Sequence, residues 1–281
     1  MTAQIIDGAK KALEIKASLK KEVKTLSEKG VTPALATILV GDDSSSRIYL
    51  KLKEKACVEV GIKSNQFELP ADASEGEVIS LITKLNSDEL VHGILVQLPL
   101  PKHLNEYKTL SNINPSKDVD GFHPQNLGKL AFKDEALAPA TPKGIVVLLE
   151  DLTRLEGKNV CIVNHSIVVG KPLALMLLSR NATVDVCHVY TKNLANHTKA
   201  ADILISATGV PKLIKKDMVA EGAIVIDVGV SKTEEGITGD VDFEKVKEKA
   251  SHITPVPGGV GPMTIAILLQ NTITAASQAH F

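Results

Sequence analysis

Two side chains suited to proton transfer lie four positions apart in a segment with helical character. Tyr49 falls in the first turn of this segment, and Lys51, Lys53 and Lys55 follow it. Only Lys53 is four residues from Tyr49, so helical geometry places this pair on one face. A phenol beside an ammonium group can seat a flat ring and move a proton. A solvated lysine-rich face is the alternative interpretation of the helix taken alone.

Further polar residues follow a strand and a turn. The run 93–101 (GILVQLPLP) has the character of a buried strand, yet it carries Gln97 close to its carboxyl end. Ligands of open α/β sheets gather at that end, and a buried amide needs a partner, which a lysine or a ligand can supply. Asp118 and Asp120 occupy the turn KDVDGFHP; turn formation is the ordinary role for Asp118, and Asp120 is equally suited to a ligand.

A third candidate is the run 255–262 (PVPGGVGP), with three prolines and three glycines in eight residues. Proline fixes φ, and glycine permits positive φ and close approach, so the loop has a specific shape whose amides can face a planar ligand. A tight connector between a strand and a helix is the alternative.

The elements that must position these residues form two series. In the first half, apolar strand-like runs alternate with helical patterns, as in a parallel sheet. The predicted strands are 34–40, 66–69 and 93–98, and the predicted helices are 8–29, 47–60 and 75–85. Between residues 110 and 142 the sequence is rich in proline and glycine, which indicates a domain boundary near residue 140.

The second half begins with a helix predicted from Thr141, with Pro142 at its first position. Five short strands follow and predict a nucleotide-binding, doubly wound fold: 159–163, 183–188, 202–206, 223–228 and 252–255. The last helix is predicted from Met263 to about Ala279. The sequence thus predicts an α/β protein with an N-terminal substrate domain, a C-terminal Rossmann-like domain with a parallel sheet, and an active-site cleft between them.

Composition limits the partners. The chain has 281 residues, with 32 basic and 33 acidic side chains, which favours a small molecule over nucleic acid. No apolar run approaches a membrane span or a signal peptide core, so a cytoplasmic location is expected. Cys57, Cys161 and Cys187 form no CxxC pair, and the last two are interpreted as small buried residues. No metal is expected, because no carboxylate or thiol lies at ligand spacing from His123 or His188.

Several long segments together resemble one family. SRIYLKLKEK (46–55), GILVQLPLP, KDVDGFHP, APATPKG, AIVIDVGV and ITPVPGGVGPMT stand in the order and spacing of the bifunctional methylenetetrahydrofolate dehydrogenase/methenyltetrahydrofolate cyclohydrolases. The resemblance covers nearly the whole chain. It implies a folate-binding catalytic domain at 1–139, with the helix 264–281 packing back toward it, and an NADP-binding domain at 140–263.

The resemblance also implies roles for individual residues. Lys53 corresponds to the catalytic lysine, Tyr49 to a residue stacking on the pterin, Gln97 to the amide that positions the lysine, and Asp120 to the carboxylate holding the pterin edge. The implied substrate contacts are Val96, Leu98, Pro257, Gly258, Gly259, Val260 and Gly261. The implied cofactor contacts are Asn164, His165, Ser166, Thr208, Gly209 and Val230. The implied reaction oxidises methylenetetrahydrofolate with NADP and then hydrolyses the methenyl product to 10-formyltetrahydrofolate, with no metal, in a homodimer.

The chain departs from the family pattern in two places. Where the family commonly has G-R-S or G-A-S, this chain has Asn164-His165-Ser166, so weakened cofactor binding is expected. Ala140 replaces a cysteine of the family segment P-C-T-P. NADP is favoured over NAD, because the second strand of this half ends in His188 and Lys192 and carries no acidic residue at its tip to bind a free 2′-hydroxyl.

Two other functions compete with the bifunctional enzyme. If the chain is a cyclohydrolase that has lost the dehydrogenase step, it should hydrolyse the methenyl compound with little NADP reduction. A non-catalytic folate- or nucleotide-binding protein is disfavoured, because binding alone does not need Lys53 placed for proton transfer.

Overall fold

The computed structural model describes residues 2–234 and 236–279, apart from the side chains of residues 44 and 45. The chain divides into two compact units. The six-stranded unit comprises residues 1–12 and 141–264, and the three-stranded unit comprises residues 13–140 and 265–281. Two of the three boundaries fall inside long helices, α1 (Gly8–Glu28) and α10 (Val260–Ala279), so each of these helices contributes to both units; the third lies between residues 140 and 141. Within the described residues, no helix is long and apolar enough to cross a membrane.

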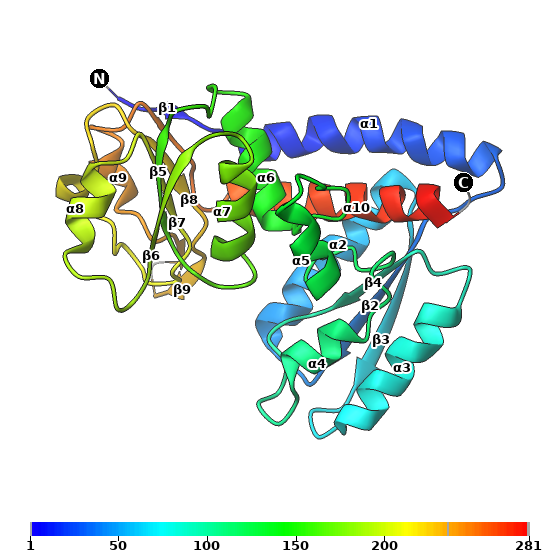
Figure 1. Ribbon diagram of the computed structural model, residues 1–281. Helices are drawn as coiled ribbons and strands as arrows, with labels where there is room; N and C mark the ends of the chain where they lie inside the picture. The colour runs from blue at the N-terminus through cyan, green and yellow to red at the C-terminus, as the bar shows by residue number, and fades with distance from the viewer. Residues whose placement is uncertain (1, 235, 280–281) are drawn as a thin grey trace. The chain divides into compact units, whose positions relative to one another are not determined.

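The three-stranded unit has a parallel sheet in the order β3-β2-β4. Its central strand, β2 (Ala34–Val40), is buried at every residue, as expected for a parallel strand covered on both faces. Its neighbours are β3 (Lys63–Leu69) and β4 (Gly93–Val96), and Figure 1 shows helices on both sides of the sheet. The helices are α2 (Ser44–Val60), α3 (Glu75–Ser87), α4 (Glu106–Ser111) and α5 (Pro124–Leu130).

Helix α2 begins and ends at residues that suit its termini. The Asp43 carboxylate accepts a hydrogen bond from the Ser46 backbone N–H at 2.7 Å, which caps the first turn. Gly61 follows the last turn with φ of 91°, and its N–H bonds back to carbonyls of that turn. These two ends fix the position along the helix of Tyr49 and Lys53.

The six-stranded unit has an entirely parallel sheet in the order β1-β11-β8-β7-β5-β6. Its strands are β1 (Gln4–Ile5), β5 (Asn159–Val163), β6 (Thr183–Cys187), β7 (Ile203–Ser206), β8 (Ile224–Asp227) and β11 (His252–Ile253). The chain passes from β5 outward to β6 and then returns across β5 to β7. Ligands of such sheets bind at the carboxyl ends of the strands where this direction changes, which here is the position between β5 and β7.

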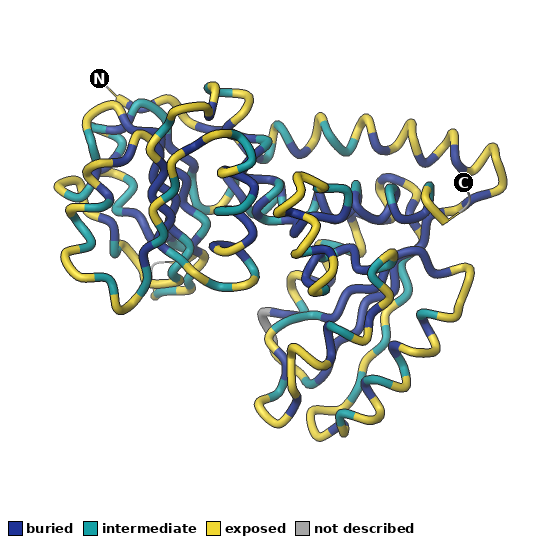
Figure 2. Tube along the Cα trace, in the orientation of Figure 1, coloured by how far each residue is buried: buried dark blue, intermediate teal, exposed yellow. Residues whose placement is uncertain are grey.

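The remaining elements of this unit cover the sheet. They are α6 (Ala140–Glu150), α7 (Gly170–Leu178), α8 (Leu194–Lys199), η1 (Lys216–Met218), α9 (Phe243–Val246) and the hairpin β9 (Ser231–Thr233) and β10 (Gly236–Thr238). Figure 1 shows α7 and α8 on opposite faces of the sheet. Figure 2 shows the inner strands as the buried layer and the outer helix surfaces as exposed.

The predicted α/β fold class with parallel sheets is confirmed. The strands 34–40 and 159–163 were predicted with the bounds that the structure gives. The last helix begins at Val260 rather than at Met263, because Pro262 is tolerated in a first turn where its missing N–H has no partner to lose. β3 begins at Lys63 rather than at 66, since its polar first half lies at a sheet edge.

Candidate functional site

A lysine and an amide meet at the carboxyl end of the three-stranded sheet. Lys53 lies on α2, which follows β2, and Gln97 lies just beyond the end of β4. The Lys53 Nζ donates to Gln97 Oε1 at 3.0 Å, and Gln97 Nε2 donates to the Leu98 carbonyl at 2.7 Å. The amide nitrogen is thereby occupied, so the amide presents its oxygen to the lysine whether the amine is charged or neutral.

The surroundings shift the pKa values of Lys53 and Asp120 in opposite directions. Burial lowers the pKa of Lys53, against the attraction of Asp120, which raises it. Burial raises the pKa of Asp120 to about 6, opposed by the charge of Lys53 and reinforced by that of Asp118. Each group is thus less inclined to carry its charge than in water. A lysine in this state can accept a proton nearer to neutral pH than an exposed lysine can.

The two carboxylates of the turn 117–124 have different surroundings. Asp118 is buried and accepts backbone N–H groups of Gly121, Phe122 and His123, as well as the Asn126 Nδ2 at 2.9 Å. This agrees with the expected turn-forming role of Asp118. Asp120, in contrast, is half-buried as a residue, and its carboxylate has no hydrogen-bond partner among the residues that the structure describes. It is the carboxylate of the turn that remains available to a ligand.

Other predicted contacts of this unit differ in accessibility. Tyr49 is 38% exposed on the same helix as Lys53, one turn earlier, so its ring is open to a partner. Leu98 is half-buried. Val96 is only 1% exposed, because it lies in the sheet core, and any role in binding would pass through its backbone.

The glycine-rich loop lies in the six-stranded unit and connects β11 to α10. Gly258 has φ of 109°, a conformation that favours glycine. Gly259 is buried, and a Cβ on the facing Gly8 would lie 1.9 Å from the Gly259 carbonyl oxygen. Val260 is also buried, whereas Pro257, Gly258 and Gly261 keep accessible surface. Part of the glycine content therefore serves chain packing, as the connector interpretation requires.

Asn164 organises the loop after β5. Its Nδ2 donates to the Ala207 carbonyl at 2.6 Å, which ties the ends of β5 and β7 together at the change of direction. Its Oδ1 accepts the Ser166 N–H at 2.7 Å, the Ser166 hydroxyl at 2.7 Å and the Gly170 N–H at 3.0 Å. The asparagine therefore closes the loop at the start of α7 with one side chain. Its φ is not positive, so the backbone is not strained.

The other predicted cofactor contacts lie at the carboxyl ends of the same strands. His165 is exposed, and its ring lies 4.8 Å from that of His188, which follows β6. Gly209 has φ of 70° and open space where a Cβ would be. Val230 follows β8 and is 49% exposed.

A pair of buried carboxyl groups beneath these loops has no counterpart in the sequence analysis. Asp240 Oδ2 accepts the Ser206 hydroxyl at 2.8 Å and the Thr208 N–H at 2.5 Å, while its Oδ1 is buried without a partner among the described residues. Asp227 accepts the N–H groups of Gly229, Asp240 and Val241. Burial is the main cause that raises the pKa of Asp227 to about 7. In the sequence, the pattern that could have indicated this pair is an aspartate inside each of the apolar segments AIVIDVGV and GDV.

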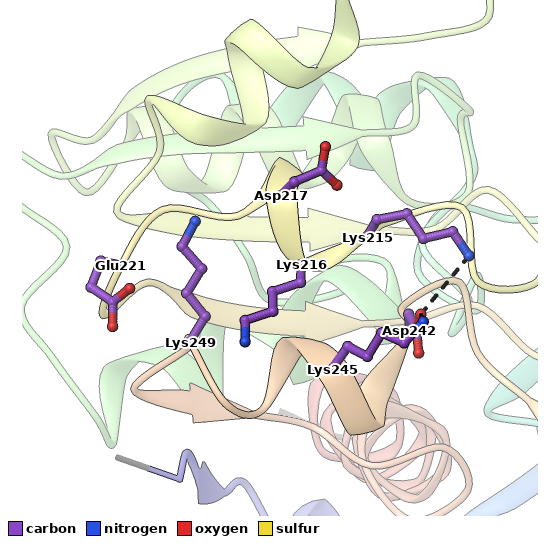
Figure 3. Close-up of a pocket in the computed structure, with 7 residues that line it drawn as sticks. All are labelled: Lys215, Lys216, Asp217, Glu221, Asp242, Lys245 and Lys249. Carbon is purple, nitrogen blue, oxygen red and sulfur yellow. Dashed lines mark ion pairs between the residues drawn. The ribbon is translucent and has the colours of Figure 1, made fainter.

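A cavity of about 600 Å³ elsewhere on the six-stranded unit is lined by four lysines and three acidic residues, drawn in Figure 3. Glu221 and Lys249 come just before β8 and β11, so the cavity lies at the amino ends of these strands. The dashed line in Figure 3 joins Lys215 to Asp242, whose Nζ and Oδ2 are 4.0 Å apart. Because ligands of such sheets bind at the opposite ends, this charged surface is not the candidate site.

The fold and the two groups of residues define a class: a two-unit α/β enzyme, in which one unit is of the nucleotide-binding type and the other holds a lysine that can accept a proton. Comparison with known proteins agrees with this class. Residues 6–120 match the tetrahydrofolate dehydrogenase/cyclohydrolase catalytic domain, and residues 139–280 match the NAD(P)-binding domain of the same family.

Full-length relatives give the same result. The bifunctional protein FolD of Methanosarcina mazei is 52% identical over 279 residues, which is 99% of this chain and 97% of the relative. The crystal structure of the bifunctional enzyme FolD from Campylobacter jejuni has a TM-score of 0.96 and 49% identity, covering 98% of this chain and 99% of that one. A Trypanosoma brucei methylenetetrahydrofolate dehydrogenase-cyclohydrolase, complexed with NADP cofactor and inhibitor, has a TM-score of 0.95 and 36% identity, covering 100% and 99%. The chain belongs to the tetrahydrofolate dehydrogenase/cyclohydrolase family.

Proposed function

We propose that this chain is a bifunctional enzyme of one-carbon metabolism. It oxidises 5,10-methylenetetrahydrofolate to 5,10-methenyltetrahydrofolate with NADP, and it hydrolyses the methenyl compound to 10-formyltetrahydrofolate. Family membership over both units and the names of the full-length relatives support both activities. The single structural observation that carries the hydrolytic step is the 3.0 Å hydrogen bond from Lys53 to Gln97 at a lysine whose pKa is lowered by burial.

Lys53 is proposed as the proton carrier of hydrolysis. Water adds to the cationic methenyl carbon and must lose a proton, which the neutral Lys53 amine accepts. The same ammonium then gives the proton to the ring nitrogen whose bond to that carbon breaks, and the hydroxyl group on the carbon releases its own proton to solvent as it becomes the formyl carbonyl. Gln97 holds the lysine in both states, because its oxygen accepts an N–H from an amine or from an ammonium group. The cationic substrate also favours the neutral form of the lysine.

Asp120 and Tyr49 are proposed to hold the pterin. The Asp120 carboxylate lacks a protein donor among the described residues, and a pterin offers adjacent ring N–H and amino groups that a carboxylate accepts as a pair. Tyr49 exposes its ring one helical turn from Lys53, where a flat ring can stack on it. Leu98 and Val96 complete the substrate contacts proposed for this unit.

The six-stranded unit has features that fit NADP, which accepts the hydride of the first step when bound. Ile167, Val210 and Val230 expose 39%, 49% and 49% of their surface just after β5, β7 and β8, which are neighbours in the sheet. The open space at Gly209 allows a ligand to approach the backbone between them. These three exposed apolar side chains suit contact with a flat ring. Asn164, Ser166 and Thr208 shape its loops, and His165 and His188 supply donors near the end of β6, where a 2′-phosphate is read in this fold.

The geometry of Asn164 supports a retained dehydrogenase step. The expected weakening of cofactor binding rested on two positions: Asn164 replaces a glycine that lets the backbone approach the phosphates, and His165 replaces an arginine that could pair with the 2′-phosphate. The Asn164 Oδ1 accepts three hydrogen bonds from within its own loop, so the side chain of Asn164 is held against the protein. The alternative of a cyclohydrolase without dehydrogenase activity has no structural observation in its favour.

The test measures both activities on the purified chain. NADP and NAD reduction with methylenetetrahydrofolate reports the first step, and loss of the methenyl absorbance without nucleotide reports the second. The Lys53→Met variant should lose hydrolysis while it still binds folate, and the Lys55→Met variant, changed on an exposed part of the same helix, should keep it. Undiminished hydrolysis by the Lys53 variant would contradict the role of this lysine.

The proposal includes a homodimer in the cytoplasm that binds no nucleic acid. The formal net charge of −1 supports the last point, since nucleic-acid binding relies on a basic surface. The homodimer rests on the resemblance to the family. Sedimentation of the purified chain at micromolar concentration should give twice the monomer mass.

A further inference from the structure

Metal-ligating side chains from two strands and one helix converge in the six-stranded unit, apart from the residues proposed for the reaction. Asp185 and Cys187 are alternate residues of β6 and so point to the same face. His197 lies on α8. The ligand atoms of these three residues all lie within 4.8 Å of one another. Cys161 on the adjacent strand β5 places its Sγ 3.8 Å from that of Cys187.

We propose that Asp185, Cys187 and His197 form a binding site for one thiophilic divalent cation such as Zn²⁺, and that Cys161, which lies outside this group of three, shifts toward it to become the fourth ligand. Sulfur, imidazole nitrogen and carboxylate oxygen are the donors that Zn²⁺ takes in proteins. This site goes beyond the proposed function, because neither reaction step needs a metal.

The spacing of the two sulfurs fits a tetrahedral site. With Zn–S bonds of about 2.3 Å, the edge between two sulfurs of a tetrahedron is about 3.8 Å. The Cys161 and Cys187 Sγ atoms are 3.8 Å apart. The His197 Nδ1 and Asp185 Oδ2 atoms are hydrogen bonded at 2.5 Å, so they must separate to roughly 3.3 Å around a metal. Both side chains can make this adjustment, since they are 37% and 50% exposed.

The donor set favours a cation. The Asp185 carboxylate oxygen lies within 4.8 Å of the Cys187 sulfur, and the Cys161 sulfur lies 3.8 Å from it. A thiolate rather than a thiol is the form of cysteine that binds a metal. Metal binding should therefore displace thiol protons and release them to solution.

The position of the site couples it to one reaction only. Cys187 immediately precedes His188, whose N–H donates to the Thr191 hydroxyl at 2.9 Å and whose ring lies 4.8 Å from that of His165. A metal on Cys187 fixes this turn in the arrangement set by the ligands. Given the proposed function, occupancy should therefore weaken NADP binding and leave hydrolysis at Lys53 unchanged.

Binding is tested without activity by titrating the full chain with Cd²⁺. The expected result is a thiolate-to-cadmium charge-transfer band that saturates at one equivalent per chain. The Cys187→Ser and His197→Asn variants should bind at least tenfold more weakly, because each loses a ligand. The His197 side chain is 37% exposed, so its replacement should leave the fold intact. Cys57→Ser is the matched control, since Cys57 is a buried cysteine of the other unit, and it should give the wild-type titration.

Two results would overturn the metal site: no band with the wild-type chain, or an equal band with the Cys187 variant. The coupling is tested separately with Zn²⁺, which should inhibit NADP reduction by the wild-type chain and not by His197→Asn, while hydrolysis without nucleotide stays constant in both. Equal inhibition of reduction in both chains would refute the coupling. A chain that binds Cd²⁺ yet lacks both activities would refute the proposed function and leave the metal site standing.

Discussion

Replacing Gln97 by glutamate tests the pairing of the amide with Lys53. The substitution puts a carboxylate where the amide oxygen accepts from Lys53 Nζ at 3.0 Å. At that distance an effective dielectric constant of about 20 gives an attraction of roughly 5 kcal/mol, and relaxation and solvent reduce such effects to about 1–3 pKa units. The pKa of Lys53, now lowered by burial, should rise by that amount.

The consequence for hydrolysis follows from the fraction of neutral lysine. Below its pKa, each unit of increase reduces that fraction tenfold, so hydrolysis at neutral pH should fall by about 10- to 1,000-fold. The lost activity should return as the pH is raised, because the lysine is still present. Gln97→Met serves as the comparison: it removes the same acceptor without adding a charge, so its rate should fall without a shift of the profile to higher pH.

The assay follows methenyl absorbance without nucleotide over a series of pH values, with the spontaneous hydrolysis of the compound subtracted at each. A profile for Gln97→Glu that keeps the wild-type midpoint, whatever its amplitude, would refute the close pairing of this side chain with Lys53. A common loss of amplitude in both variants with unchanged midpoints would assign Gln97 to positioning alone.

Three further predictions concern the six-stranded unit. Burial raises the pKa of Asp227 to about 7, above the pKa of an unfolded carboxyl group. The contribution of Asp227 to the free energy of unfolding is therefore complete below about pH 4 and is lost as the pH rises through 7. Asp240→Asn should reduce this loss of stability, as measured by urea unfolding across that pH range. Gly170→Ala should lower the melting temperature and NADP affinity together, because the new Cβ would lie 2.1 Å from the Asn164 carbonyl oxygen, and equal values for both chains would contradict this packing. His165→Ala should weaken NADP binding by roughly tenfold and leave NAD binding unchanged in titration calorimetry, since only NADP carries the phosphate; an equal loss for both would argue against phosphate recognition.

Periodicity and burial predicted the elements that position the site. The run 34–40 is apolar throughout and forms the buried central strand, and the spacing of four residues places Tyr49 and Lys53 on one helix face. The need of Gln97 for a partner followed from its place in an apolar run, and the structure identifies that partner as Lys53, 44 residues earlier in the sequence. The identity of the partner was open because either a lysine or a ligand satisfies an amide.

Contacts between distant segments account for what the sequence did not indicate. β1 has two residues, and it is a strand because it pairs with β11, almost 250 residues later. Asp185 and His197 gave no signal at ligand spacing, since the register of β5 against β6 and the packing of α8 bring them to the cysteines. The sequence indicates at Asn164 only the loss of a glycine. The side chain of Asn164 bonds to the Ala207 carbonyl and the Gly170 N–H, and these partners come close to it only through the sheet order and the start of α7.

The two units therefore differ in the kind of group that each presents to a ligand. The three-stranded unit holds a lysine with a lowered pKa and a carboxyl group whose pKa is raised to about 6, so a proton can move there at little electrostatic cost. In the six-stranded unit, Asp240 accepts from Ser206 at the end of β7 and from Thr208 just after it, and the exposed groups that follow the strands are apolar or imidazole. Hydride transfer to a nucleotide needs orientation rather than a protein base, and water addition needs the base. Substitutions at Lys53 should thus affect hydrolysis most, and substitutions at His165 should affect only the reaction that uses NADP.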